Sequence, residues 1–271
     1  MERQLEELVT AVQASAKYRS IAPELIRQLA AQELAKRRTQ KEAIKATKNK
    51  LHQIAGAYLA DLPDYNEWNA ALRAAWAACE NLRPLCRTWL LEHASTRERV
   101  SLLEEFYTQI FNGVPSVTSI LDLACGLNPL TIPWMNLEPE TCYFACDIYQ
   151  DQADFFQQAL TWLRVKGEAF TCNLLESVPT QTVDVALLLK AIPCLEQADK
   201  TIASRLISQV QAKVLIVSFP GRSLGGHSRG MATYYEAHFT QLMHAFPYRY
   251  DKIEFNNELV FRIFKHESAN P

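Results

Sequence analysis

The stretch SILDLACGLNPLTIPW, from Ser119 to Trp134, decides the fold. It begins as a short apolar run, which is typical of a buried strand, and continues into a turn around Gly126. Glycine adopts backbone angles that other residues avoid, and it lets a ligand approach the chain closely. Pro129 follows at a position that suits the start of a helix. The stretch therefore predicts a strand, a tight turn and a helix, with the turn shaped to hold a ligand.

Downstream of Val117 the chain alternates between strand-like and helix-like segments. Short apolar runs predict strands at residues 117–124, 142–148, 169–174, 183–189 and 213–220. Residues 151–165 and 194–210 between them are expected to be helices. This alternation predicts an α/β fold, with a parallel sheet covered by helices on both faces. The last two runs, 248–255 and 257–265, leave no room for a helix and predict an antiparallel pair that closes the sheet.

The first part of the chain, up to about Phe111, follows a different pattern. Apolar residues recur there at helical spacing, as in Leu5, Leu8 and Val12, and Gly56 is its one glycine. This part is expected to be all-helical. Between Ala16 and Lys50, ten basic residues stand against three acidic ones, a local charge of +7 in a chain of net charge -2. Such a segment is either a solvated helix face or a surface that docks on phosphate.

The overall composition excludes several classes of protein. The chain has 271 residues, of which 48 % are hydrophobic, as in ordinary globular proteins. Its seven cysteines form no CxxC pair and no Cys/His cluster with zinc-ligand spacing, so they indicate reduced core thiols. The beginning, MERQLEELVT, lacks the apolar core of a signal peptide, and runs such as 185–189 are too short to span a bilayer. A soluble cytoplasmic protein is expected.

Polar residues near the predicted strand ends indicate the ligand. In a sheet of this kind ligands bind outside the carboxyl ends of the strands, where Asp122, Asp147 and Asn173 are expected. A pyrophosphate would call for GxGxxG in the first turn, but this turn has one glycine. An acid about 20 residues downstream suits ribose hydroxyls. The pattern favours a nucleoside without a phosphate chain, such as S-adenosylmethionine; the alternative is a plain strand–turn–helix in which Asp147 has no ligand.

Seven blocks spread over the chain carry a resemblance to a known family. They are YRSIAPELIRQL from Tyr18, LHQIAGAYL from Leu51, LEHASTRERV from Leu91, ILDLACGLNPL from Ile120, CDIYQ from Cys146, LLLKAIPCLE from Leu187 and VSFPGRSLGGHSRGM from Val217. On these blocks the chain resembles the aminoglycoside-resistance methyltransferases that modify N7 of guanosine 1405 in 16S ribosomal RNA. The resemblance implies a Rossmann-like class I methyltransferase domain at residues 112–271 behind an N-terminal all-helical domain at residues 1–111 that binds ribosomal RNA.

The resemblance also assigns the cofactor, S-adenosylmethionine, and the residues that bind it. Arg99 in HASTRER would bind the methionine carboxylate, because a guanidinium fork suits a carboxylate. The turn with Ala124 and Gly126 would line the methionine moiety. The ribose would be bound by Asp147 beside Ile148, and the adenine by Asn173 with Leu174. This chain departs from the family at Asn173, where Asp is usual, and at Tyr149, where His is usual.

The resemblance also indicates which residues lie at the target end of the site. Guanine N7 has a lone pair and no proton, so methyl transfer to it needs no general base, and the enzyme has to flip the base out and position it. The expected catalytic residues are Lys190, Arg222 and Ser223. The expected RNA-binding residues are Lys17, Arg19, Lys48, Lys50, His52, Arg229 and Met231. The residues themselves leave alternatives open. Lys190 could be a snorkelling strand-end lysine, Arg222 and Arg229 could belong to a solvated hairpin, Met231 could be a packing residue, and His52 taken alone could be an interface histidine.

The implied partner is the 30S subunit near helix 44 of its 16S RNA, with the protein acting as a monomer. Methylation at guanosine 1405 would confer resistance to 4,6-disubstituted 2-deoxystreptamine aminoglycosides. Two other interpretations stay open at this point. One is a methyltransferase that acts on a small molecule, which leaves the basic segment unexplained. The other is a catalytically silent protein that binds RNA or the ribosome and has kept the fold.

Overall fold

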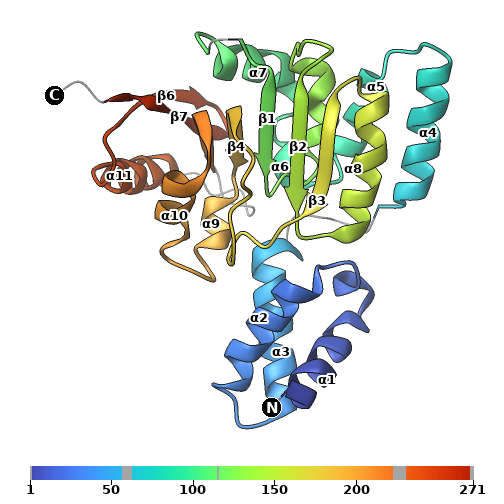
Figure 1. Ribbon diagram of the computed structural model, residues 1–271, viewed down its shortest axis with the longest axis vertical. Helices are drawn as coiled ribbons and strands as arrows, with labels where there is room; N and C mark the ends of the chain where they lie inside the picture. Colours follow the sequence, from blue (N-terminus) through green and yellow to red (C-terminus); the bar gives the residue numbers. More distant parts are fainter. Residues whose placement is uncertain (1, 57–62, 115, 222–229, 269–271) are drawn as a thin grey trace.

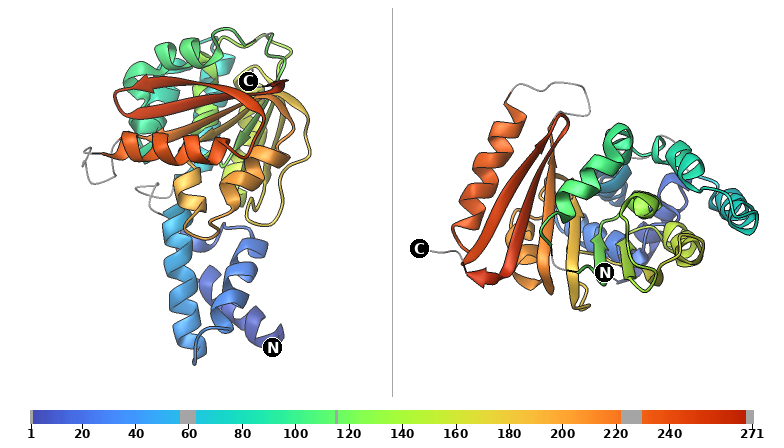
Figure 2. Two further views of the ribbon diagram at one scale, coloured as in Figure 1. Left: turned by 90° about the vertical axis from the view of Figure 1, so that its left-hand side faces the viewer. Right: turned by 90° about the horizontal axis from the view of Figure 1, so that it is seen from above.

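The computed structural model describes residues 2–56, 63–114, 116–221 and 230–268 of the chain. Its centre is a seven-stranded sheet with helices on both faces, and three N-terminal helices project from one end of this α/β layer (Figures 1 and 2). Among the described residues, no helix has the length and apolar character needed to cross a bilayer.

The sheet has the strand order β3-β2-β1-β4-β5-β7-β6. The strands are β1 (Ser119–Leu123), β2 (Cys142–Asp147), β3 (Lys166–Thr171), β4 (Val183–Leu189), β5 (Ala212–Pro220), β6 (Tyr248–Phe255) and β7 (Glu258–Ser268). The first five are parallel, whereas β7 runs antiparallel between β5 and β6. The predicted α/β class and the closing antiparallel pair are therefore confirmed. The strand order changes direction between β1 and β4, which is where such sheets bind ligands.

Helices cover the sheet from α8 onward. They are α8 (Gln150–Trp162), α9 (Ile192–Leu195), α10 (Ile202–Gln209) and α11 (Met231–Met243). The helix expected over residues 194–210 is broken, because Asp199 accepts hydrogen bonds from the backbone and hydroxyl of Thr201 and makes a turn there. The helix expected after Pro129 is a 3-10 segment, η4 (Asn128–Trp134), in which Pro133 lacks the N–H that a longer helix needs.

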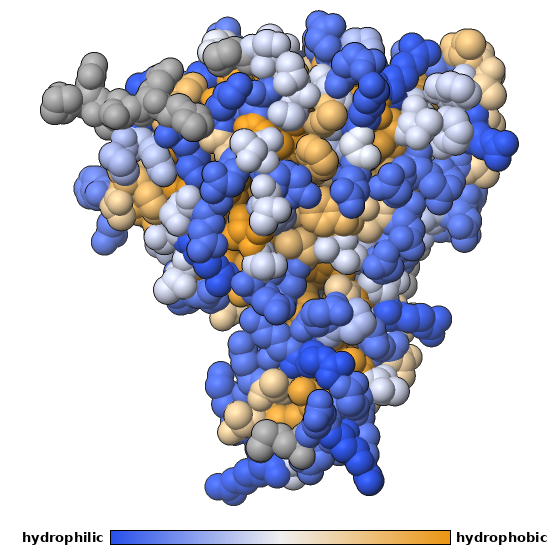
Figure 3. Space-filling model, viewed as in Figure 1, coloured by the Kyte–Doolittle hydropathy of each residue, from blue (hydrophilic) through white to orange (hydrophobic). Residues whose placement is uncertain are grey.

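The predicted all-helical domain at residues 1–111 divides into two parts in the structure. Its elements are α1 (Glu2–Gln13), η1 (Ala16–Tyr18), α2 (Pro23–Leu34), α3 (Gln40–Leu51), η2 (His52–Gly56), α4 (Tyr65–Ala77), α5 (Arg83–Leu90), α6 (Ala94–Arg97), η3 (Val100–Leu102) and α7 (Leu103–Phe111). The first three helices pack on one another and project from the α/β layer (Figure 1); we call residues 2–56 the N-terminal unit. Hydrophilic side chains cover much of its visible surface (Figure 3).

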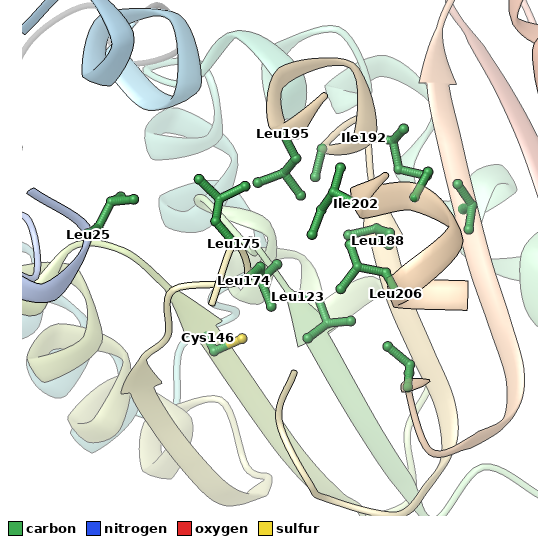
Figure 4. Packing of buried hydrophobic residues seen from close by; sticks show 14 of the residues in the cluster. Leu25, Leu123, Cys146, Leu174, Leu175, Leu188, Ile192, Leu195, Ile202 and Leu206 are labelled. Carbon is green, nitrogen blue, oxygen red and sulfur yellow. The ribbon is translucent and has the colours of Figure 1, made fainter. Parts of the chain in front are cut away.

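The helices from α4 to α7 belong instead to the α/β layer. Trp68, Trp89 and Phe106 share a hydrophobic core with Ile120 of β1 and Tyr143 of β2. Their large apolar side chains find a partner in this face of the sheet, so the expected boundary near residue 111 does not separate two independently packed bodies. The opposite face of the sheet packs in a second core that extends to Leu25 of the N-terminal unit (Figure 4).

A chain of polar groups runs through the first of these cores. Asp122 of β1 is 1 % exposed, and its Oδ2 accepts hydrogen bonds from Tyr143 Oη at 2.6 Å and Asn128 Nδ2 at 2.9 Å. Asn128 Oδ1 in turn accepts one from Tyr107 Oη at 2.8 Å. Burial raises the pKa of the Asp122 carboxyl to about 7, although both donors oppose the shift. Asp122 therefore orders the turn after β1 from inside the core.

Replacing Asp122 by Asn should reduce the loss of stability with rising pH. The folded carboxyl has a pKa of about 7 against 3.8 when unperturbed, so the folded state retains a proton that the unfolded chain has already released. The contribution of this carboxyl to the free energy of unfolding is largest below pH 3.8. It decreases by about 1.4 kcal/mol per pH unit as the pH rises and is lost once the pH passes about 7. Urea unfolding of both proteins at about pH 5 and about pH 8 measures the difference. An equal pH dependence in the two proteins would contradict this assignment.

Candidate active site

A pocket opens at the carboxyl ends of β1 to β4, at the point where the strand order changes direction. The space inside it, including the part that is open to solvent, is about 800 Å³. Its wall is formed by Leu25, Ile54, His93, Ser95, Ala124, Gly126, Asp147, Ile148, Tyr149, Gln152, Cys172, Asn173, Leu174, Leu175, Leu189, Lys190, Ala191, Cys194 and Leu195. Most of the residues expected to bind cofactor, and Lys190, are among them.

The turn after β1 lines the pocket with backbone. Ala124 and Gly126 both have positive φ angles, 50° and 51°. This conformation is strained for alanine, and such strain is often found at binding sites. A Cβ atom at Gly126 would lie 3.0 Å from the ring of His93, so the space beside this turn suits glycine. Gln152 of α8 donates a hydrogen bond to the Gly126 carbonyl and so stabilises the turn.

Asp147 is fixed at the end of β2 by two backbone donors. Its Oδ2 accepts a hydrogen bond from Gly126 N and its Oδ1 accepts one from Ile148 N, both at 2.7 Å. Burial raises the pKa of the Asp147 carboxyl, and the two backbone hydrogen bonds act in the opposite direction. Each carboxylate oxygen has a further lone pair that can accept a ligand hydroxyl. The predicted ribose acid is therefore held rigidly on the pocket wall.

Asn173 lies two residues beyond the end of β3, which is Thr171. Its Oδ1 accepts a hydrogen bond from Leu175 N at 3.1 Å, and its Nδ2 donates to Gln28 Oε1 at 2.8 Å. Asn173 is 9 % exposed. Because its amide already has hydrogen-bond partners at both ends, only its remaining hydrogen-bonding capacity is available to a ligand. Leu174 beside it offers an apolar surface that suits a purine ring.

Lys190 follows β4 in a left-handed backbone conformation with φ 58°. Its Nζ donates to Glu98 Oε2 at 2.6 Å and lies 3.3 Å from Glu258 Oε2. The side chain is 3 % exposed, so this is a paired internal cation and the snorkelling alternative is excluded. Lys190 thus reaches the pocket with its charge already balanced by two carboxylates.

Arg99 does not line the pocket, which differs from the expectation that it binds the methionine carboxylate. Its Nε and Nη2 donate to the two carboxylate oxygens of Glu258 at 3.0 and 2.6 Å, and its Nη1 donates to Asn128 Oδ1 at 3.0 Å. The guanidinium fork is therefore filled by a carboxylate of the protein itself. Burial alone would raise the pKa of Glu258, but the charges of Arg99 and Lys190 hold it below its usual value.

His93 and Glu258 are site residues that the sequence did not indicate. Burial, together with the nearby charges of Arg99, Lys190 and Arg97, lowers the pKa of His93 to about 3. Its imidazole is therefore neutral at physiological pH. His93 begins the HASTRER block, which was the available signal for it, whereas Glu258 lies 159 residues from Arg99 and no local pattern connects the two.

The N-terminal unit supplies one wall of the pocket. Leu25 of α2 and Ile54 of η2 are among the lining residues. Backbone hydrogen bonds join the unit to the loop after β2, from Ala22 N to Ile148 O at 2.8 Å and from Gln150 N to Ser20 O at 2.7 Å. The unit is thus attached directly beside Asp147.

Three of the expected RNA-binding residues lie together on the surface of the N-terminal unit. Lys17, Arg19 and His52 are exposed, and Lys17 Nζ lies 3.0 Å from His52 Nδ1. These side chains are available to a partner, and their role in RNA binding stays a prediction.

Lys48 and Lys50 are in a different setting. Lys48 Nζ donates to Ser15 Oγ at 2.6 Å, and Lys50 Nζ lies 2.8 Å from the buried carboxylate of Glu33. Their amines are used at least partly to hold the unit together. Met231 is the first residue of α11 and is partly buried. The predictions for Arg222, Ser223 and Arg229 fall outside the described residues.

Comparisons with known proteins identify the family of this chain. A family model described as ribosomal RNA methyltransferase (FmrO) matches residues 14–262. A 16S rRNA (guanine(1405)-N(7))-methyltransferase of Micromonospora rosea is 38 % identical over 265 residues, which cover 96 % of this chain and 97 % of that protein. A protein of the same name from Serratia marcescens is 31 % identical and covers 97 % of this chain and 99 % of its own length.

Solved structures extend the similarity to three dimensions. The crystal structure of the 16S rRNA methyltransferase RmtF in complex with S-adenosyl-L-homocysteine superposes with a TM-score of 0.82 at 28 % identity, over 97 % of this chain and 99 % of that one. The 16S rRNA methylase RmtB superposes with a TM-score of 0.75 at 27 % identity, over 97 % and 98 % of the two chains. The resemblance found in the sequence and the class I methyltransferase fold are both confirmed, and the chain belongs to the FmrO family of ribosomal RNA methyltransferases.

Proposed function

We propose that this protein transfers a methyl group from S-adenosylmethionine to N7 of guanosine 1405 in 16S ribosomal RNA. The observation that carries the proposal is the pocket at the strand switch, in which the Asp147 carboxylate is held by the N–H of the Gly126 turn. Relatives 31–38 % identical over nearly the whole chain carry this activity in their names. The protein acts in the cytoplasm, as a monomer, on the 30S subunit near helix 44.

The pocket fits the cofactor at each of its three parts. Asp147 would accept the ribose hydroxyls, and Leu174 with Asn173 would bind the adenine. The backbone of Ala124 and Gly126, which lines the pocket, would follow the methionine part. When bound, S-adenosylmethionine supplies an electrophilic methyl group on a positively charged sulfonium.

The charges around the pocket suit a positively charged ligand. The imidazole of His93 is neutral, since its pKa is lowered to about 3. Lys190 is paired with Glu98 and Glu258, so it adds little repulsion. Asp147 contributes a negative charge on the opposite side. A cation in this space therefore faces balanced or negative groups.

The same arrangement suits an acceptor that carries no proton. Guanine N7 attacks with its lone pair, so no side chain has to remove a proton and the site has to hold the two reactants in line. Lys190 serves this at the pocket edge, where its amine is held by Glu98 and its backbone N–H by Ser218. The product base is cationic, and the carboxylates of this cluster favour that charge.

The basic face of the N-terminal unit would dock on the ribosomal RNA backbone. Lys17, Arg19 and His52 are exposed there and lie on the same unit that forms a wall of the pocket. Basic side chains bind phosphate without reading sequence, so they position the protein on a folded RNA surface.

Expression of the protein in a sensitive bacterium should methylate guanosine 1405. Borohydride and aniline treatment cleaves RNA at 7-methylguanosine, and primer extension on 16S RNA should then stop at this position. The cells should tolerate gentamicin and kanamycin, because the methyl group removes a hydrogen-bond acceptor and adds positive charge where a cationic ring of these drugs binds. They should stay sensitive to apramycin. A strong stop at another nucleotide, or resistance to apramycin alone, would refute the assigned target.

Substitutions at the two ends of the molecule should separate cofactor binding from docking. Asp147→Ala removes charged acceptors and should weaken S-adenosylhomocysteine binding about tenfold to a hundredfold in calorimetric titration. Lys17→Glu combined with Arg19→Glu should leave that affinity unchanged, weaken binding to 30S subunits and flatten its salt dependence. Thermal unfolding serves as the control for folding. Wild-type affinity in Asp147→Ala would exclude this residue from the ribose contact.

Cys172 offers a chemical test of the pocket. Its pKa is lowered because the thiol of Cys146 donates a hydrogen bond to it, and it lines the pocket. Cys79 is exposed outside the pocket and serves as an internal control. With limiting N-ethylmaleimide, S-adenosylhomocysteine should slow the alkylation of Cys172 and leave that of Cys79 unchanged, as followed by peptide mass spectrometry. Equal rates at Cys172 with and without the ligand would place the ligand elsewhere.

A further inference from the structure

One hydrogen bond joins the N-terminal unit to the adenine side of the pocket. Gln28 of α2 accepts it through Oε1 from Asn173 Nδ2, at 2.8 Å. Gln28 lies three residues after Leu25, which lines the pocket, so the two side chains share a face of α2. The same helix face therefore provides an apolar wall and a polar contact to the loop that would bind adenine.

The surrounding backbone fixes the orientation of both amides. Leu175 N–H can only donate, and it donates to Asn173 Oδ1 at 3.1 Å. The Nδ2 end of Asn173 consequently points toward α2, where it meets Gln28 Oε1 and, at 3.5 Å, Glu176 Oε2. Since Nδ2 can only donate, Gln28 has to present its oxygen. The direction of the Gln28 amide is thus set by the backbone of the loop after β3.

The loop after β3 is held by two other elements of the structure. Arg205 Nη2 of α10 donates to the carbonyls of Leu174 and Leu175, each at 2.9 Å. Gln28 of α2 accepts the hydrogen bond from Asn173 Nδ2. The Arg205 contact lies within the α/β layer, whereas the Gln28 contact joins the loop to the N-terminal unit.

We propose that Gln28 is a positioning residue for the cofactor, and that its bond to Asn173 couples cofactor binding to docking on the RNA substrate. The proposal rests on the proposed function, because it takes the pocket as the cofactor site and the basic N-terminal unit as the docking surface. Bound cofactor favours the arrangement in which Asn173 donates to Gln28 of helix α2. The docked unit holds Gln28 against Asn173 in return. Each ligand therefore favours the arrangement that the other binds, and the coupling is reciprocal.

Calorimetric titration of S-adenosylhomocysteine into five variants tests the positioning role. Gln28→Met keeps the length of the side chain and removes the acceptor, and should weaken binding by roughly two- to tenfold. Gln28→Glu keeps an acceptor oxygen and should bind within about twofold of wild type. Gln32→Met, one turn further along α2, removes only a 3.3 Å contact with Lys50 and should bind as wild type. In an Asn173→Ala background, Gln28→Met should have no further effect, since the partner is gone.

A second measurement tests the coupling. Filter binding of radiolabelled S-adenosylhomocysteine, with and without saturating 30S subunits, gives the factor by which the subunit strengthens ligand binding. That factor should exceed one in wild type and in Gln32→Met, and should fall toward one in Gln28→Met. A merely structural role of Gln28 would lower both affinities and leave the factor unchanged.

The outcomes separate this inference from the proposed function. Wild-type affinity in Gln28→Met, or an equal effect of that substitution with and without Asn173, overturns the positioning role. A coupling factor that is the same in wild type and Gln28→Met overturns the coupling. Wild-type protein that binds no S-adenosylhomocysteine overturns the proposed function and this inference together, whereas wild-type binding with an unaffected Gln28→Met overturns the inference alone.

Discussion

A single buried carboxylate, that of Glu258, holds together the segments that meet beneath the pocket. It accepts both arms of Arg99, lies 3.3 Å from Lys190 Nζ, and accepts a hydrogen bond from Ser218 Oγ at 2.5 Å. Two buried cations without this partner would be costly, since breaking a buried ion pair from one side costs about 3–5 kcal/mol. Insertion of β7 beside β5 places Glu258, its first residue, at this point.

This pairing also determines what the pocket presents to a ligand. Lys190 and Arg99 form ion pairs with Glu98 and Glu258 inside the protein. Their positive charges are therefore neutralised by the protein and are not available to a ligand. The neutral His93 fills the space beside Gly126 and adds no charge. Asp147 differs from these two cations, because its carboxylate on the pocket wall accepts its hydrogen bonds from the backbone N–H groups of Gly126 and Ile148. The site therefore combines a rigid frame with a field suited to a cationic cofactor and a cationic product.

Much of the fold could be predicted from residues that act locally. The apolar runs, the glycine turn and the spacing from Gly126 to Asp147 predicted parallel strands with a nucleoside site at their ends. Lys190 is expected at the target end of the site from the resemblance, and the structure places it on the pocket wall. The break at Asp199 and the 3-10 segment with Pro133 differ from the prediction, because each depends on one polar or proline residue inside an apolar pattern whose periodicity continues past it.

The sequence by itself determined which residues stand at the strand ends, because alternation and turn chemistry are properties of neighbouring residues. Tertiary structure alone decided their partners. Arg99 and Glu258 are 159 residues apart, and Gln28 and Asn173 are 145 apart. An arginine that suits a ligand carboxylate suits a protein carboxylate equally well, so only the packing of β7 shows which one it holds. The neutral state of His93 likewise follows from burial and from cations that only the fold brings near it.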